Sequence, residues 1–208
     1  MILGIDTSGE TCYIALIDQP NNSVKCTQFN HNRELIEQLP AYIDAFLAEN
    51  NATLKAIECL VCGTGPGSFT GVRVGVMYAK TLAFALGKPV IGISSFDAAA
   101  YEDISINRAV VCTSKRNEVI AAVYPVYAKS PSIGPVAVAT AAWDDWLTEH
   151  LQGTERITGQ GIKGANAPVG NLALGACLLA EPLLATGNFS DIDSLIPLYV
   201  ATSPGGGM

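Results

Sequence analysis

The run from Gly63 to Gly75, with the sequence GTGPGSFTGVRVG, constrains this chain more than any other stretch. A short apolar segment, residues 57–62, precedes it, and a long segment without proline, residues 72–86, follows it. The first pattern is typical of a strand buried on both faces. The second ends in a glycine with a proline soon after, which is a usual stop for a helix. We therefore expect a strand, a tight loop and a helix, with Thr70 as the helix N-cap.

The run has two physical uses, and the residues alone leave both open. Glycines in the loop, among them Gly65 and Gly67, would let backbone amides point at an anion such as phosphate, although neither named phosphate-loop fingerprint is matched. The second use lies in the helix, where small residues recur every four positions and form a smooth stripe that lets another helix approach closely. These residues are Gly71, Gly75, Ala79 and Ala83.

Composition indicates a cytoplasmic globular protein. The 208 residues are 49% hydrophobic, enough for a buried core, and the net charge is -7. An acidic chain binds nucleic acid poorly by itself, so a nucleic-acid function would require a partner. The N-terminus has no signal-peptide pattern, and no apolar run reaches the ~18 residues of a membrane span.

No metal site is predicted. Cys59 and Cys62 form a C-x-x-C pattern, but residues three apart in a strand point to opposite faces, so the two sulfurs should diverge. The two histidines, His31 and His150, are far apart in sequence and lack a helical partner at metal-ligand spacing.

The order of expected elements predicts an α/β protein of the actin-like ATPase (ASKHA, RNase H-like) fold. Residues 1–104 read as three strands, a helix, a strand, a helix, a strand and a short helix. Residues 105–208 read as a shortened β-β-β-α-β-α copy, and a last strand is expected at residues 195–199. The chain would then have two tandem lobes: an N-terminal lobe with the glycine loop and the partner-binding helices, and a smaller C-terminal lobe.

In that architecture the first hairpin turn faces a nucleotide, which makes Asp6, Thr7 and Ser8 candidates for contacting a phosphate or its magnesium ion. The alternative is that these side chains only satisfy turn amides. Catalytic groups are sparse, since the second hairpin turn, residues 113–117, has no aspartate and no histidine has a catalytic context. The economical interpretation is a non-catalytic relative of nucleotide-dependent enzymes.

Three strings resemble the bacterial TsaB (YeaZ-like) family: ILGIDTS at residues 2–8, GPGSFTGVRVG at residues 65–75 and GISS at residues 92–95. Weaker matches are Glu118-Val119, residues 159–161 and residues 197–199. The resemblance departs from the family pattern at Leu35-Ile36 and at residues 113–115, where a partner or nucleotide could bind.

The resemblance implies a non-catalytic scaffold subunit in the formation of N6-threonylcarbamoyladenosine at position 37 of tRNAs that read ANN codons. It implies pairing with the catalytic TsaD-type subunit, addition of a TsaE-type ATPase, a homodimer when alone, and contact with tRNA only through the complex. On this resemblance the chain requires no cofactor, although it could bind ATP or ADP weakly. The expected partner interface comprises Gly71, Arg73, Gly75, Ala79 and Ala83, with Leu39 and Ile43 of the first helix.

The alternative hypothesis is an independent enzyme of the same fold, either a nucleotide-dependent kinase or an M22-type peptidase. It would need a complete set of carboxylates or histidines, which the sequence does not provide.

Overall fold

The computed structural model describes residues 1–30, 34–114, 117–151, 153–154, 156–159 and 161–201. Of the residues singled out in the sequence, His31 and part of the second hairpin turn lie outside the described ranges. The chain divides into two compact units, residues 1–98 with 171–197 and residues 99–170 with 198–208. Among the described residues, no helix has the length and apolar character needed to cross a membrane.

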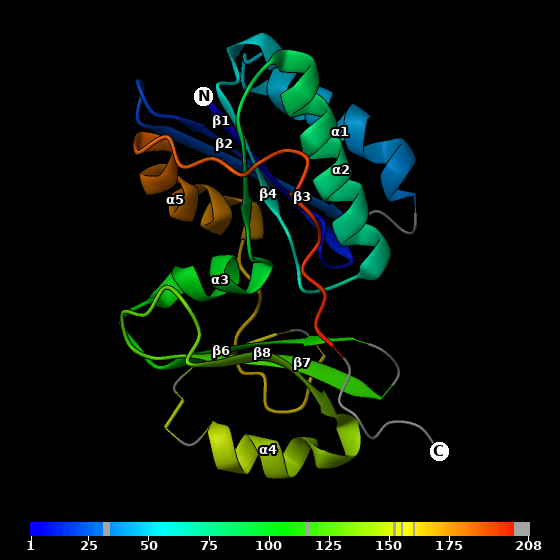
Figure 1. Ribbon diagram of the computed structural model, residues 1–208, viewed down its shortest axis with the longest axis vertical. Helices are drawn as coiled ribbons and strands as arrows, with labels where there is room; N and C mark the ends of the chain where they lie inside the picture. Colours follow the sequence, from blue (N-terminus) through cyan, green and yellow to red (C-terminus); the bar gives the residue numbers. More distant parts are fainter. Residues whose placement is uncertain (31–33, 115–116, 152, 155, 160, 202–208) are drawn as a thin grey trace. The chain divides into compact units, whose positions relative to one another are not determined.

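The first unit is built on a five-stranded sheet (Figure 1). Its strand order is β3-β2-β1-β4-β5, with bounds Ser23–Asn30, Thr11–Asp18, Ile2–Asp6, Cys59–Gly63 and Val90–Ile93. The first three strands pair antiparallel, whereas β4 and β5 run parallel to β1. Every residue of β1 and β4 is buried, as expected for central strands covered on both faces.

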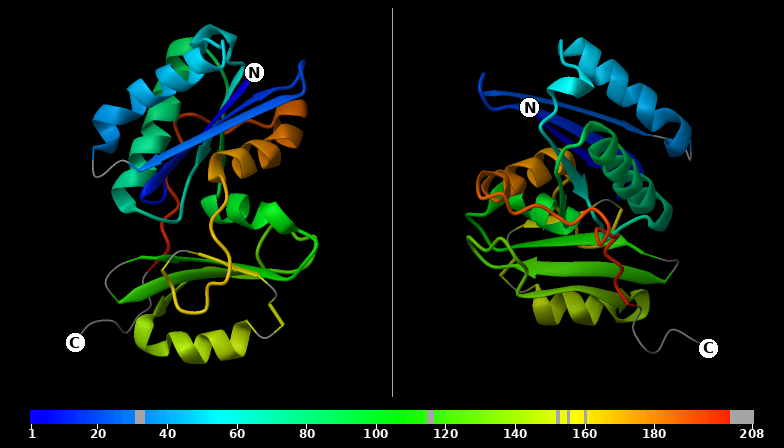
Figure 2. Two further views of the ribbon diagram at one scale, coloured as in Figure 1. Left: turned by 180° about the vertical axis from the view of Figure 1, so that it is seen from behind. Right: turned by 45° about the horizontal axis from the view of Figure 1, so that its top comes forward.

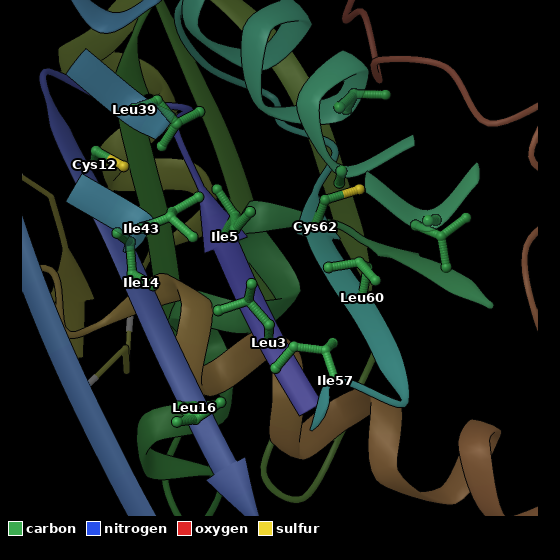
Figure 3. Close-up of a cluster of buried hydrophobic side chains, with 14 of the residues drawn as sticks. Leu3, Ile5, Cys12, Ile14, Leu16, Leu39, Ile43, Ile57, Leu60 and Cys62 are labelled. Carbon is green, nitrogen blue, oxygen red and sulfur yellow. The ribbon is translucent and has the colours of Figure 1, made fainter. Parts of the chain in front are cut away.

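Three helices cover the first sheet: α1 (Leu35–Glu49) and α2 (Phe69–Leu86) on one face and α5 (Leu172–Ala185) on the other (Figure 2). Leu39 and Ile43 of α1 are fully buried in the core cluster, where Figure 3 shows them with Leu3, Ile5 and Ile14 of the strands. On the opposite face, α5 packs closely against Gly4 of β1. A Cβ at Gly4 would overlap the Cys177 sulfur and lie 2.8 Å from the Ala173 carbonyl oxygen, both of α5.

The second unit has a four-stranded sheet of order β8-β7-β6-β9. Its strands are Ile133–Ala139, Glu118–Tyr124, Arg108–Thr113 and Arg156–Thr158. Its core cluster includes Trp143 of α4 (Trp143–His150) together with Val111 and Ala121 of the strands. The short α3 (Ser95–Ala100) ends where this unit begins, and 3-10 turns occur at Leu54–Ala56, Tyr101–Asp103 and Thr140–Ala142.

The sequence correctly predicts the fold class and the order of most elements, but three details differ. Helix α2 begins at Phe69, within the glycine run, and its N-cap is Ser68, whose hydroxyl accepts the Gly71 amide at 3.2 Å, whereas the sequence predicted Thr70 as the N-cap. Residues 195–199 form no strand, because Leu195 packs into the first core and Lys80 donates to its carbonyl oxygen at 3.0 Å. Helix α5 groups with the first unit, although the sequence order placed it in the C-terminal lobe.

The small-residue stripe of α2 faces its own sheet. Gly71, Gly75, Ala79 and Ala83 are all buried. The Thr7 hydroxyl donates to the Gly71 carbonyl oxygen at 2.7 Å. A Cβ at Gly71 would overlap the Thr7 carbonyl oxygen, and one at Gly75 would overlap the Thr7 hydroxyl. The stripe therefore allows the helix to lie close over the turn that follows β1.

We predict that Gly71→Ala destabilises the protein by about 1–3 kcal/mol, because the added methyl group must displace backbone in a packed interior. Urea unfolding followed by circular dichroism measures the change. Gly9→Ala is the matched control, since the nearest atom to a Cβ there is 3.8 Å away and the expected effect is within about 0.5 kcal/mol. Equal stability of the two variants would contradict the close packing of α2 on the turn.

Candidate functional site

The candidate site is centred on Asp6, the last residue of β1. Its carboxylate is fully buried and accepts three hydrogen bonds. One oxygen accepts the Ser8 amide at 2.8 Å and the Ser8 hydroxyl at 2.6 Å, and the other accepts the Ser95 hydroxyl at 2.6 Å. Both carboxylate oxygens are therefore occupied by donors from within the chain.

Backbone hydrogen bonds hold the glycine loop against the residues that surround this carboxylate. Gly65 donates its amide to the Ser95 hydroxyl at 3.1 Å and accepts the Ser95 amide at 2.8 Å. The Ser68 amide donates to the Ser8 carbonyl oxygen at 2.6 Å, and the Thr64 amide donates to the Ile93 carbonyl oxygen at 2.8 Å. The loop, the first turn and the start of α3 thus form one hydrogen-bonded unit, which we call the Asp6 knot.

Glycine is required where the loop meets the knot. A Cβ at Gly63 would overlap the Asp6 carboxylate, and a Cβ at Gly67 would overlap the Ser8 carbonyl oxygen. Gly65 has a φ of +88°, in the left-handed region that side chains disfavour. The loop glycines are therefore explained by close packing and backbone angle.

Burial dominates the electrostatics of Asp6. It raises the pKa of the carboxyl above its ordinary value, although the donors of Ser8 and Ser95 act in the opposite direction. A negative charge at this position is stabilised by dipoles of the chain's own hydroxyls and amide rather than by solvent.

The arrangement bears on the predicted phosphate site. Ser8 lies against Gly67, Asp6 is linked to Gly65 through the Ser95 hydroxyl, and Thr7 bonds to Gly71. However, both oxygens of the Asp6 carboxylate already accept donors from within the chain, and the amide of Gly65 is already bonded to Ser95. Phosphate binding here stays a prediction, and the geometry favours the alternative in which these groups satisfy the turn.

The outer face of α2 is a second candidate surface, and its large residues were missed by the sequence argument. Phe69, Met77 and Phe84 are 58%, 59% and 82% exposed, and the Arg73 guanidinium lies 3.7 Å above the Phe69 ring centroid. The signal was present, because α2 carries apolar residues on both faces, whereas a helix that only covers its own sheet has a polar outer face. We call these four residues the α2 outer face.

Of the seven predicted interface residues, which lie on α1 and α2, one is exposed and six are buried. Arg73 is exposed on the α2 outer face. The four small residues of the stripe, with Leu39 and Ile43, are buried in the core of the first unit. Small residues at period-four spacing predict that a neighbour packs closely against the helix. They do not show whether that neighbour is the chain's own sheet or another molecule.

The described residues hold no group of three or more histidine, cysteine or acidic side chains that could bind a metal ion. Cys62 lies in the core beneath α1 and α2, and Cys59 alternates to the other face, so the expected divergence of these sulfurs is confirmed. Burial raises the pKa of the Cys59 thiol to about 11 and that of Cys62 to about 12, which makes both poor nucleophiles.

The sheet orders and helix placement define an α/β protein of the actin-like, RNase H-like fold. A solved structure from Pseudomonas aeruginosa, of an uncharacterized protein with similarity to the peptidase YeaZ, matches it with a TM-score of 0.77. That match covers 96% of this chain and 99% of the other at 22% identity.

The family model described as TsaD, tRNA N6-adenosine threonylcarbamoyltransferase, matches residues 30–170, and the chain belongs to this family. It is a TsaB/YeaZ-like member, being 36% identical over 110 residues to the tRNA threonylcarbamoyladenosine biosynthesis protein TsaB of Haemophilus influenzae. That alignment spans 52% of this chain and 45% of the relative. An uncharacterized Mycobacterium tuberculosis protein is 33% identical over 172 residues, covering 79% of this chain and 74% of its own length.

We predict that Asp6→Asn destabilises the protein most at low pH. Because the folded protein holds the Asp6 proton more tightly than the unfolded chain, the stabilisation from Asp6 is complete below its ordinary pKa. It is lost as pH rises through the higher folded pKa. The stability difference between wild type and variant should therefore narrow as the pH rises from below the ordinary pKa of aspartate, about 4, toward neutral pH.

Midpoints of urea unfolding for wild type and variant, measured across that pH range, show whether the stability difference narrows or widens as the pH rises. Asp145→Asn, at an exposed carboxylate of α4, is the control for general effects of charge removal. A difference that widens as pH rises would mean that the hydrogen-bond donors, rather than burial, control the Asp6 carboxyl.

Proposed function

We propose that this chain acts in the biosynthesis of threonylcarbamoyladenosine in tRNA, the process that the names of its TsaB relatives state. The product would be N6-threonylcarbamoyladenosine at position 37 of tRNAs that read ANN codons. Support comes from membership of the TsaD family together with similarity to TsaB over about half of the chain.

Within that process we infer a subunit without chemistry of its own. The carboxylate best placed for metal or phosphate chemistry, Asp6, is committed to hydrogen bonds with Ser8 and Ser95. The second hairpin turn lacks an aspartate in the sequence. A catalytic member of this fold needs several carboxylates to hold its metal and orient the attacking group, and these two positions do not supply them.

The observation that carries the proposal is the α2 outer face. Two phenylalanines and a methionine are exposed along one side of a helix whose other side is already buried in its own unit. Large apolar residues exposed along one side of a helix are a common feature of protein interaction sites, and here the Arg73 guanidinium also lies over the Phe69 ring. We assign this face, with exposed Ile36 and Tyr42 of α1, to pairing with a TsaD-type catalytic subunit.

Further partners follow from the same proposal. Alone, the chain would cover this face by forming a homodimer, and in the complex a TsaE-type ATPase would join the pair. Contact with tRNA would come through the complex, since the chain is acidic with a net charge of -7. Nucleotide binding to the chain itself would be weak, because the Asp6 knot uses the loop amide of Gly65.

The competing proposal is an independent kinase or peptidase of the same fold. It predicts a chain that turns over substrate without a partner and is indifferent to a TsaD-type protein. Size-exclusion chromatography with light scattering separates the two, using the chain alone and mixed with the TsaD-type protein of the same organism. We expect a homodimer that exchanges into a heterocomplex, whereas a monomer that ignores the partner would contradict the scaffold function.

We predict that Met77→Asp and Phe84→Asp each weaken pairing with the TsaD-type protein at least tenfold, because a charge would be desolvated within an apolar contact. Calorimetric titration gives the affinities, and thermal unfolding should show little change, since both side chains are exposed. Val24→Asp, at a 48% exposed position on β3, is the control and should bind as wild type does. Undiminished pairing of both α2 variants would remove this face from the interface.

A further inference from the structure

The segment that follows α5 stays on the first unit and covers one edge of its sheet. Residues 188–197, which we call the strap, pass from the end of α5 along β5 to α2 (Figure 1). The Ser190 amide donates to the Val90 carbonyl oxygen at 3.0 Å, and the Gly92 amide donates to the Ser190 hydroxyl at 3.0 Å. The strap therefore pairs with backbone groups that an edge strand would otherwise leave open.

The strap next places one side chain in the core. Leu195 is 9% exposed and belongs to the core cluster of the first unit. A Cβ at Gly92 would overlap the Leu195 side chain, so the glycine in β5 provides the space that Leu195 fills. A turn precedes this residue, because the Asp191 carboxylate accepts the Ser194 amide at 3.1 Å. The backbone of the strap is therefore held in place immediately before Ile196.

Lys80 of α2 binds the strap directly. Its ammonium group donates to the Leu195 carbonyl oxygen at 3.0 Å and to the Asp193 carbonyl oxygen at 3.4 Å. Lys80 comes three residues after Met77 and four residues before Phe84, a spacing that places side chains on the same side of a helix. The strap is thus tethered to α2 next to the α2 outer face.

Ile196 is the residue that this tether presents to solvent. It directly follows Leu195, and its side chain is 66% exposed. The buried Leu195 side chain and the Lys80 hydrogen bond to the Leu195 carbonyl oxygen hold the backbone on which Ile196 stands. An apolar side chain on a fixed backbone loses little conformational freedom when a partner buries it.

We propose that Ile196 is a further contact residue for the TsaD-type subunit and that Lys80 is the positioning residue that holds it beside the α2 outer face. The choice of partner rests on the proposed function, which assigns the α2 outer face to that subunit. Two observations support the extension: the tether starts between Met77 and Phe84, and it ends one residue before an exposed isoleucine. The surface for the partner would then be built from two segments distant in sequence.

The test measures the affinity of the full chain for the purified TsaD-type protein of the same organism by calorimetric titration. We expect Ile196→Ser to weaken pairing about fivefold or more, with little change in thermal unfolding, because the side chain is exposed. Val24→Ser is the matched control, since Val24 is an exposed β-branched residue of β3, at the opposite edge of the sheet from β5, and should pair as wild type does.

A double-mutant cycle tests the positioning role of Lys80. Lys80→Met removes the ammonium group and should also weaken pairing about fivefold, whereas Lys80→Arg keeps hydrogen-bond donors and should pair within about twofold of wild type. In a chain that already carries Ile196→Ser, Lys80→Met should weaken pairing by no more than about a further twofold, because the residue that it positions is gone. Additive losses would contradict action of Lys80 through Ile196.

The outcomes separate this inference from the proposed function. If Met77→Asp loses pairing while Ile196→Ser pairs as wild type does, the proposed function stands and the contact at Ile196 is refuted. If Ile196→Ser weakens only the homodimer, measured by light scattering, the residue serves a second copy of the chain and the inference is also refuted. A wild-type chain that does not pair with the TsaD-type protein would overturn both.

Discussion

A single buried carboxylate organises the end of the first sheet. Asp6 closes the central strand and accepts donors from the turn that follows it and from Ser95, at the start of a helix 89 residues away in sequence. The Ser95 hydroxyl in turn accepts the Gly65 amide. The shape of the glycine loop, and with it the first turn of α2, therefore depends on a polar interaction in a place that water does not reach.

This interaction explains why a loop rich in glycine need not be an anion site. The same absence of side chains that would let a phosphate approach also lets Gly63 and Gly67 lie against Asp6 and Ser8. Spacing in the sequence does not distinguish these uses, since both need small residues. The distinguishing fact is which acceptor each amide reaches, and those acceptors, Ile93, Ser95 and Ser8, are supplied by distant segments.

Local patterns predicted the strands, the two long helices and the fold class, because alternation, helix periodicity and stop signals depend on neighbouring residues. These patterns did not show which sheet each helix packs against. Helix α5 follows the second sheet in sequence but packs on the first, where Gly4 leaves room for Ala173 and Cys177. The α2 stripe had the same ambiguity, since its partner proved to be Thr7, 64 residues from Gly71 in sequence.

The two sides of α2 differ in what they contact. Its inner side packs on the turn that follows β1, where the Thr7 hydroxyl donates to the Gly71 carbonyl oxygen and Gly75 leaves room for the Thr7 side chain. Its outer side exposes Phe69, Met77 and Phe84. If the α2 outer face docks a partner as proposed, the hydrogen bonds of the Asp6 knot would keep α2 in one position for that contact.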